Sequence, residues 1–179
     1  MKKYFFAQAK SALMCSVFFT LACSHSLYSV QTPKDKINEW VKSCPWIGLV
    51  ANEVTCGPIT LKDLDLDKKG RFVIALPGEE INASVKYSVD ADRLESWNLH
   101  HIAVGIKGQD DPICITHSFG VWDKNGKACF TLKAPEKKGV YEVRFDYQEA
   151  MLCSDAAKAW RKNNPSAKAT VGIIIVDNS

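Results

Sequence analysis

An alternating stretch in the second half of the chain constrains its fold most strongly. After a charged turn that contains Pro135 and Gly139, apolar and polar residues alternate over residues 140–147. Such alternation is typical of a half-buried β-strand, because successive side chains point to opposite faces of a sheet. The residues expected on the buried face are Tyr141, Val143, Phe145 and Tyr147.

Similar short segments recur along the chain, with turn residues between them. Strands are predicted at 47–54, 59–66, 72–76, 81–89, 99–106, 113–119, 128–132, 140–147 and 169–176. One helix is expected at about 154–163, because Ser154 suits its N-cap and Pro165 follows its end. Regularly spaced short strands predict a mainly β fold. We expect a single β-sandwich of about eight strands with one α-helix before the last strand.

The segment at 132–147 also resembles part of a known family. Its turn with Pro and Gly, followed by Tyr141 at the start of an alternating strand, resembles the penultimate strand of immunoglobulin-like β-sandwiches. In that family, such a tyrosine hydrogen-bonds back to the preceding loop. Antibody domains carry a cysteine two residues after this tyrosine, whereas Val143 occupies that position here. The resemblance implies an immunoglobulin-like sandwich module of a secreted bacterial protein.

The N-terminus predicts an export signal. Lys2, Lys3 and Lys10 form a basic region, and residues 12–23 are an apolar run that is short for a bilayer span of about 20 residues. We expect a signal peptide at 1–26, an N-terminal extension with a short helix at 27–43, and the β-sandwich domain at 44–179. The alternatives are a retained anchor and an N-terminus lipid-modified at Cys23.

Removal of this signal changes the charge of the chain. Three lysines leave with residues 1–26, so 23 basic residues become 20, equal to the 20 acidic residues, and the net charge of +3 falls to zero. This balance, with interspersed signs, argues against the clustered basic face of a nucleic-acid-binding protein. The protein is expected in the periplasm or outside the cell, with no membrane partner unless Cys23 is lipidated.

Five cysteines remain after residue 26: Cys44, Cys56, Cys114, Cys129 and Cys153. Disulfides are the usual state of cysteines in exported proteins, and an odd number predicts two bridges and one leftover thiol. We favour Cys44 with Cys56, because the segment between them contains Pro and Gly and closes a short loop. A second bridge is expected among the other three cysteines, with its pairing open.

Two sets of residues are candidates for a metal site. The first begins like an EF-hand calcium loop and consists of Asp63, Asp65 and Asp67. Lys68 replaces the glycine that such a loop needs, so we expect a solvated acidic face instead. The second set is His101 and His117, which could share one face of a sheet if their strands are neighbours. They would supply two ligands, fewer than the four of a structural zinc site, so ordinary half-buried histidines are favoured.

The sequence contains no recognisable catalytic motif, which favours a non-catalytic protein. Trp97 and Trp122 fall in predicted loops beside Asn and Asp residues. Aromatic side chains in such loops suit stacking on sugars or contact with a protein partner, although they could also cap the ends of the sandwich. The predicted function is therefore an exported binding module for a glycan or protein, without a cofactor. The alternatives are a small secreted hydrolase with a carboxylate or Cys–His site, involving Cys114 or Cys153, and a weak metal-binding domain.

Overall fold

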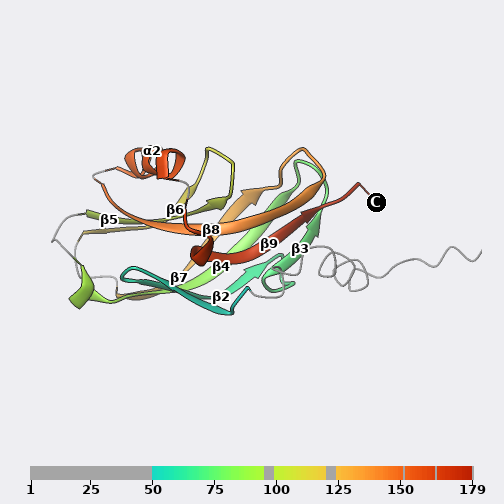
Figure 1. Cartoon of the computed structure of the whole chain (residues 1–179). Coiled ribbons are helices and arrows are strands. Elements are labelled where there is room, and N and C mark those ends of the chain that lie inside the picture. Colours follow the sequence, from blue (N-terminus) through green and yellow to red (C-terminus); the bar gives the residue numbers. More distant parts are fainter. Residues whose placement is uncertain (1–49, 95–98, 120–123, 151, 164, 179) are drawn as a thin grey trace, which may run out of the picture. The chain divides into compact units, whose positions relative to one another are not determined.

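The computed structural model describes residues 50–94, 99–119, 124–150, 152–163 and 165–178, which all belong to one compact unit. The expected signal peptide and N-terminal extension lie outside these residues. In the described part, the chain forms nine strands, one α-helix and two 3-10 turns (Figure 1). They are β1 (Glu53–Cys56), β2 (Ile59–Leu66), β3 (Phe72–Ala75), β4 (Glu80–Val89), η2 (Ala91–Arg93), β5 (Leu99–Ile106), β6 (Ile113–Phe119), β7 (Asn125–Lys133), β8 (Gly139–Glu149), α2 (Cys153–Asn163), η4 (Ala167–Ala169) and β9 (Thr170–Val176).

Hydrogen bonding divides the strands between two sheets. The first sheet is antiparallel, with strand order β1-β2-β4-β7. The second has the order β3-β9-β8-β5-β6, and β3 runs parallel to β9. The prediction of a mainly β fold with one helix before the last strand is confirmed. The count of about eight strands is wrong, because nine strands form the two sheets, and the shortest two, β1 and β3, are edge strands of four residues each.

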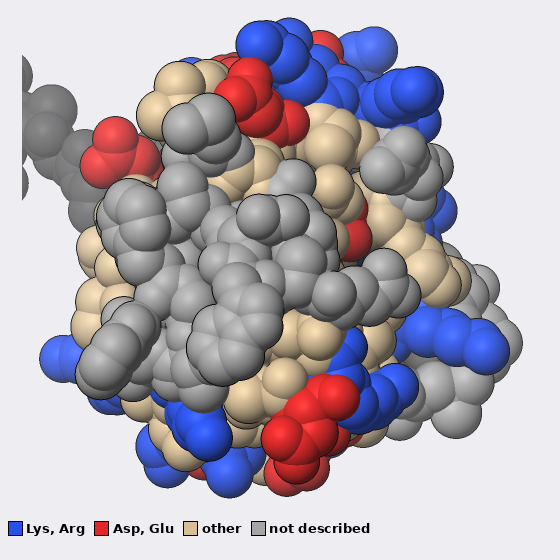
Figure 2. Space-filling model, turned by 90° about the vertical axis from the view of Figure 1, so that its left-hand side faces the viewer, with Lys and Arg blue, Asp and Glu red and all other residues tan. Residues whose placement is uncertain are grey.

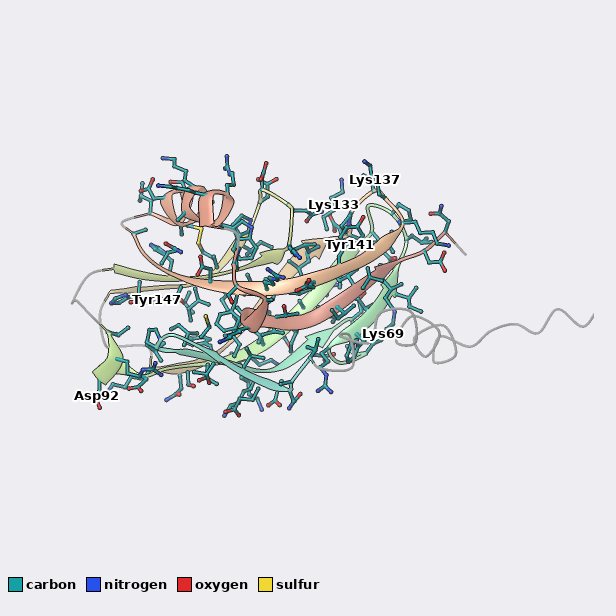
Figure 3. The ribbon with its side chains drawn as sticks, in the orientation of Figure 1. Lys69, Asp92, Lys133, Lys137, Tyr141 and Tyr147 are labelled. Carbon is teal, nitrogen blue, oxygen red and sulfur yellow. A yellow bond between two sulfur atoms is a disulfide. The ribbon has the colours of Figure 1, made fainter. Side chains whose placement is uncertain are left out.

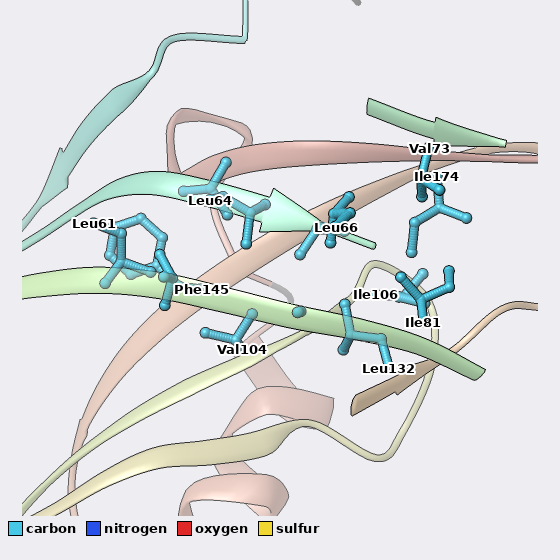
Figure 4. Close-up of a cluster of buried hydrophobic side chains, with 14 of the residues drawn as sticks. Leu61, Leu64, Leu66, Val73, Ile81, Val104, Ile106, Leu132, Phe145 and Ile174 are labelled. Atoms are coloured by element: carbon cyan, nitrogen blue, oxygen red, sulfur yellow. The ribbon is translucent and has the colours of Figure 1, made fainter. Parts of the chain in front are cut away.

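The two sheets pack their apolar faces against each other. One cluster of buried side chains contains residues from both sheets (Figure 4). Among its members are Leu61, Ile81 and Leu132 from the first sheet and Ile106, Phe145 and Ile174 from the second. Phe145 is the largest of the fully buried side chains. The domain therefore has two layers of strands around one main core, as Figure 1 shows.

Strand β8 has the inner face that its sequence predicts. Val143 and Phe145 are buried in the core, and Tyr141 and Tyr147 pack against it from the same face. The Tyr141 hydroxyl donates a hydrogen bond of 2.8 Å to the carbonyl oxygen of Lys137 (Figure 3). Lys137 lies in the turn before β8, so this bond is of the kind that the resemblance implied for the tyrosine of the penultimate strand.

Helix α2 connects β8 to β9 and lies on the outer side of the five-stranded sheet (Figure 1). Its Trp160 is buried, and the indole Nε1 donates to the carbonyl oxygen of Gln109 at 3.1 Å. A Cβ atom at Gly105 of β5 would lie 2.9 Å from Cζ2 of Trp160, so glycine allows the helix to approach this strand. Within the described residues, no helix has the length and apolar character that a bilayer span requires.

Candidate functional site

The end of the domain at which β5 begins carries the predicted ligand-binding connections. Trp97 and Trp122 themselves lie outside the described residues. Trp97 belongs to the connection before β5, and Trp122 belongs to the connection after β6. Leu99 and Phe119, at which these connections join β5 and β6, pair directly with each other. Both connections therefore leave from the same end of this strand pair.

His100 lies at the start of β5, at this same end of the domain, and its side chain is packed in the interior. Its side chain is 5% exposed, and its ring stacks on the ring of Tyr147 from β8, with centroids 5.2 Å apart. A hydrogen bond joins Nδ1 of His100 to the Tyr147 hydroxyl. Figure 3 shows Tyr147 near this end of β8. His100 is thus a buried side chain packed against Tyr147.

The two histidines of the candidate metal site lie on neighbouring strands. His101 of β5 pairs directly with His117 of β6, so the condition for sharing one face is met. His101 is buried, whereas the side chain of His117 lies outside the described part of the chain. Among the described residues there is no group of three or more His, Cys, Asp or Glu side chains that could hold a metal ion. A site at His101 and His117 therefore stays a prediction.

Two of the three clustered aspartates stabilise a turn. Asp65 Oδ1 accepts a hydrogen bond of 2.9 Å from the Gly70 backbone N–H, and Asp67 Oδ1 accepts one of 2.9 Å from the Asn82 backbone N–H. Asp67 and Lys68 both have left-handed backbone conformations, with φ of 49° and 59°. The turn takes the chain from β2 in the first sheet to β3 in the second. Backbone hydrogen bonds therefore account for the presence of carboxylates at Asp65 and Asp67.

The third aspartate, Asp63, lies at an irregularity in the pairing of β2 with β4. It accepts hydrogen bonds from Lys86 Nζ at 2.8 Å and from Asn52 Nδ2 at 3.0 Å. These two bonds hold the pKa of Asp63 below its ordinary value. The side chain of Asp63 is 45% exposed, so this carboxylate lies on a solvated face, as expected.

A cavity of about 620 Å³ lies between β1, η4 and the outer face of β8, and the sequence analysis did not identify it. Charged side chains of both signs line it, namely Glu53, Lys107, Glu142, Arg144 and Lys168. Arg144 and Glu142 are two residues apart on β8 and form an ion pair, with Nη2 of Arg144 2.6 Å from Oε2 of Glu142. Arg144 Nη1 also donates to the carbonyl oxygen of Pro165.

Glu142 is the acceptor at the centre of this cavity. Burial by itself would raise the pKa of Glu142, but hydrogen bonds from Thr170 and Arg144 outweigh that effect and hold the pKa below its ordinary value. Thr170 Oγ1 donates at 2.7 Å, and Lys107 Nζ lies 3.3 Å from Oε1. Glu142 is therefore ionised at neutral pH, and its negative charge is balanced by the nearby cations Arg144 and Lys107.

The cysteines are bridged in part. Cys114 and Cys153 form a disulfide that joins β6 to the start of α2, which confirms a second bridge among the last three cysteines. Neither is thus available for the Cys–His chemistry that we considered. Cys56 and Cys129 are free thiols. The structure therefore does not support the favoured Cys44–Cys56 bridge, and Cys44 itself lies outside the described residues. Cys56 packs against the core, which explains how this cysteine is accommodated as a thiol.

Burial favours the neutral form of one free thiol, Cys56. The pKa of Cys56 is raised first by burial and then by the nearby Asp146 carboxylate. Burial also raises the pKa of Asp146. Cys56 consequently stays a neutral thiol at neutral pH, whereas a nucleophilic cysteine needs a lowered pKa.

We expect loss of the disulfide to lower the stability of the domain considerably. In a Cys114→Ser/Cys153→Ser variant, the free energy of unfolding should fall by about 2–4 kcal/mol, because the bridge closes a loop with a sequence separation of 39. Urea unfolding followed by circular dichroism measures the change. Reduction of the wild-type protein should cause the same loss and should leave the variant unchanged. A variant as stable as the oxidised wild type would contradict this prediction.

Comparison with known proteins provides no family for this chain. No protein-family model matches the sequence, and no curated protein matches it.

Proposed function

We propose that this chain is an exported, non-catalytic binding module of the immunoglobulin-like class. Its ligand, a glycan or a protein, binds at the end of the domain where the connections with Trp97 and Trp122 meet. The observation that carries this proposal is the direct pairing of Leu99 with Phe119, which brings the two connections to one end of β5 and β6.

Strand connectivity supports the immunoglobulin-like class. In that fold, the strands A, B and E share one sheet, and C, F and G share the other, with C′ beside C in variable-type domains. Strands β2, β4 and β7 occupy the first set of positions, and β5, β8 and β9 occupy the second. β6 then takes the place of C′ beside β5. The hydrogen bond from Tyr141 to Lys137 is the local feature expected at the start of strand F.

The same correspondence favours this end for ligand binding. In variable domains, the B–C, C′–C″ and F–G loops form the binding surface at one end of the sandwich. The B–C position corresponds to the connection that contains Trp97, and Trp122 lies in the connection that follows C′. Figure 2 looks onto this end and shows charged side chains of the described residues around its margin. Aromatic residues are enriched at binding sites, and a polar rim commonly surrounds such sites.

Contacts of the other candidate groups also favour binding over catalysis. Asp65 and Asp67 hold a turn, His100 is packed against Tyr147, and Cys114 is bridged to Cys153. Each of these groups therefore has a structural partner. The Cys114–Cys153 disulfide is consistent with an extracellular location, which agrees with the proposed export.

Replacement of the two tryptophans tests the proposed site. Binding of the purified protein to a glycan array and to immobilised cell-surface proteins is compared for wild type, Trp97→Ala and Trp122→Ala. We expect at least a tenfold loss of binding in each variant with an unchanged melting temperature, because hot-spot aromatics carry about 2 kcal/mol or more of binding energy.

Leu76→Ala is the matched control for this experiment. Leu76 is 54% exposed and follows β3, at the opposite end of the domain from the start of β5. Its replacement should leave both binding and melting temperature unchanged. If both tryptophan variants unfold, or if they bind as well as the wild type, the tryptophans do not form a ligand site and the proposal is wrong.

A further inference from the structure

Strand β7 is an edge strand of the first sheet and pairs on one side only in the described part of the chain. Two backbone hydrogen bonds just beyond its ends show which residues of β7 bond to β4. Val89 N–H donates to Lys124 O at 2.7 Å, and Ala134 N–H donates to Glu79 O at 2.8 Å. Because bonded pairs alternate along an antiparallel ladder, the even-numbered residues of β7 bond to β4. The backbone groups of the odd-numbered residues face the open edge.

The open edge is centred on a free cysteine. Gln109 Nε2 donates to Lys133 O at 3.4 Å, which caps the last residue of the edge. Edge-facing backbone groups thus extend over Asn125, Lys127, Cys129 and Thr131. The side chains of Lys127, Cys129 and Thr131 are exposed, and Cys129 carries a free thiol. The edge is therefore long enough to accept another strand and carries a reactive group at the centre of its Lys127–Thr131 segment.

We propose that this edge pairs with β7 of a second copy of the chain, across a two-fold axis at Cys129, and that the two Cys129 thiols form a disulfide. An unpaired edge offers N–H and C=O groups to another strand, and pairing of identical edges gives a closed dimer of cyclic symmetry. The number of cysteines after residue 26 is odd, and an unpaired cysteine in an exported protein is a further indication of intermolecular pairing.

Side chains along β7 favour this register. With the axis at Cys129, Lys127 lies opposite Thr131 of the second copy, and no two lysines face each other. On the inner face, the half-buried Phe130 lies opposite Ala128 of the second copy, which leaves space for its ring. A register shifted by two residues, with the axis at Phe130, would place Lys127 opposite Lys133 of the second copy. Like charges directly opposite each other destabilise a strand pair.

The geometry of the ladder also suits a disulfide. Cys129 is an odd-numbered residue, so it would form a hydrogen-bonded pair with its own copy. The Cα atoms of such a pair are about 5.5 Å apart, within the range of about 4.4–6.8 Å that disulfides require. The two side chains would lie on the same outer face of the joined sheet. Opposed Cβ atoms of such a pair are about 5 Å apart, so a small local approach of the two strands brings the thiols within bonding distance.

Glutathione disulfide can supply the oxidising equivalents. One Cys129 thiolate attacks a sulfur of glutathione disulfide, which forms a mixed disulfide and releases one glutathione thiolate. The Cys129 thiolate of the second copy then attacks the protein sulfur of the mixed disulfide and releases the other glutathione thiolate. The protons of the two cysteines pass to the two glutathione thiolates. Two protein thiols are oxidised, and one glutathione disulfide is reduced to two thiols.

Oxidation of the purified protein tests the disulfide. After incubation with glutathione disulfide, non-reducing electrophoresis and peptide mapping should show a covalent dimer in which Cys129 is joined to Cys129. A Cys129→Ser variant should give no such dimer. A monomer that persists after oxidation, or a dimer joined through another cysteine such as Cys56, would overturn the proposal.

A pair of charge variants at Thr131 tests the register independently of the cysteine. Thr131→Lys places a lysine opposite Lys127 of the second copy, at two symmetric positions, whereas Thr131→Glu places an opposite charge there. We expect Thr131→Glu to form the Cys129 dimer about tenfold faster than Thr131→Lys. Both variants should melt at the temperature of the wild type, because residue 131 lies on the exposed face of β7. Equal rates for the two variants would exclude the register centred on Cys129.

Discussion

Replacement of Phe145 by alanine is expected to lower the free energy of unfolding by about 3–5 kcal/mol. Phe145 is 0% exposed and lies between the two sheets, where its ring belongs to the cluster shown in Figure 4. Removal of the ring leaves a cavity that the sheets can close only in part, because both are held by their own hydrogen bonds. Urea unfolding monitored by circular dichroism measures the loss.

Phe145→Leu is the matched control for this prediction. Leucine keeps an apolar side chain that fills much of the same space, so the loss should be about 1 kcal/mol. Equal losses in the two variants would mean that the ring does not fill the space between the sheets. Such a result would contradict the packing described for β8.

Replacement of Arg144 by methionine is the second change with a large expected effect. Arg144 and Glu142 are 5% and 14% exposed, so the variant leaves an ionised carboxylate buried beside an apolar side chain. Breaking a buried ion pair in this way costs about 3–5 kcal/mol. We expect the lower end of that range, because Thr170 and Lys107 still donate to Glu142. Urea unfolding at pH 7 measures the difference from wild type.

The pH dependence of this difference identifies its cause. In the wild type, the pKa of Glu142 is lowered, so its ionised form stabilises the folded state at neutral pH and that stabilisation is lost as the pH falls through the folded pKa. In the variant, burial without Arg144 raises the pKa of Glu142, so its protonation relieves the penalty on acidification. The difference in the free energy of unfolding between wild type and Arg144→Met should therefore become smaller as the pH falls towards 4.

Two further variants separate the ion pair from general loss of charge. Lys107→Met should cost no more than about 1 kcal/mol, because Lys107 is 45% exposed and its bond to Glu142 is screened by solvent. A Glu142→Leu/Arg144→Met variant should recover much of the stability lost in Arg144→Met, since no unpaired charge remains. A double variant as unstable as Arg144→Met would show that the penalty does not come from Glu142.

Local sequence patterns predicted the parts of the fold that depend on neighbouring residues. The alternation over 140–147 determines the inner face of β8, because the period of a strand is set by the backbone alone. Helix α2 was located to within one residue, since it begins at Cys153 and Ser154, the predicted N-cap, lies in its first turn. Pro165 follows its end for an equally local reason, because proline cannot continue a helix. The turn with Pro135 and Gly139 likewise placed Tyr141 correctly for its hydrogen bond to the preceding turn.

Properties that depend on distant segments were not predictable in the same way. Glu142 and Arg144 alternate with apolar residues, so the sequence indicates a polar face for them, but η4 and β1 cover that face in the folded chain. Their burial therefore depends on residues more than twenty positions away. The partner of Cys114 was open for the same reason, because only the packing of α2 against β6 brings Cys153 close to it.

The position of β9 in its sheet has a consequence for the order in which the domain can be completed during synthesis. The only strand pairing that β3 has among the described residues is with β9, about a hundred residues later in the sequence. β9 also lies between β3 and β8, so the sheet has no link from β3 to its other strands until residues 170–176 leave the ribosome. A nascent chain that ends before residue 170 therefore leaves the apolar segment at 72–75 without a strand to pair with. Strand β3 can therefore join its sheet only after β9 has been synthesised.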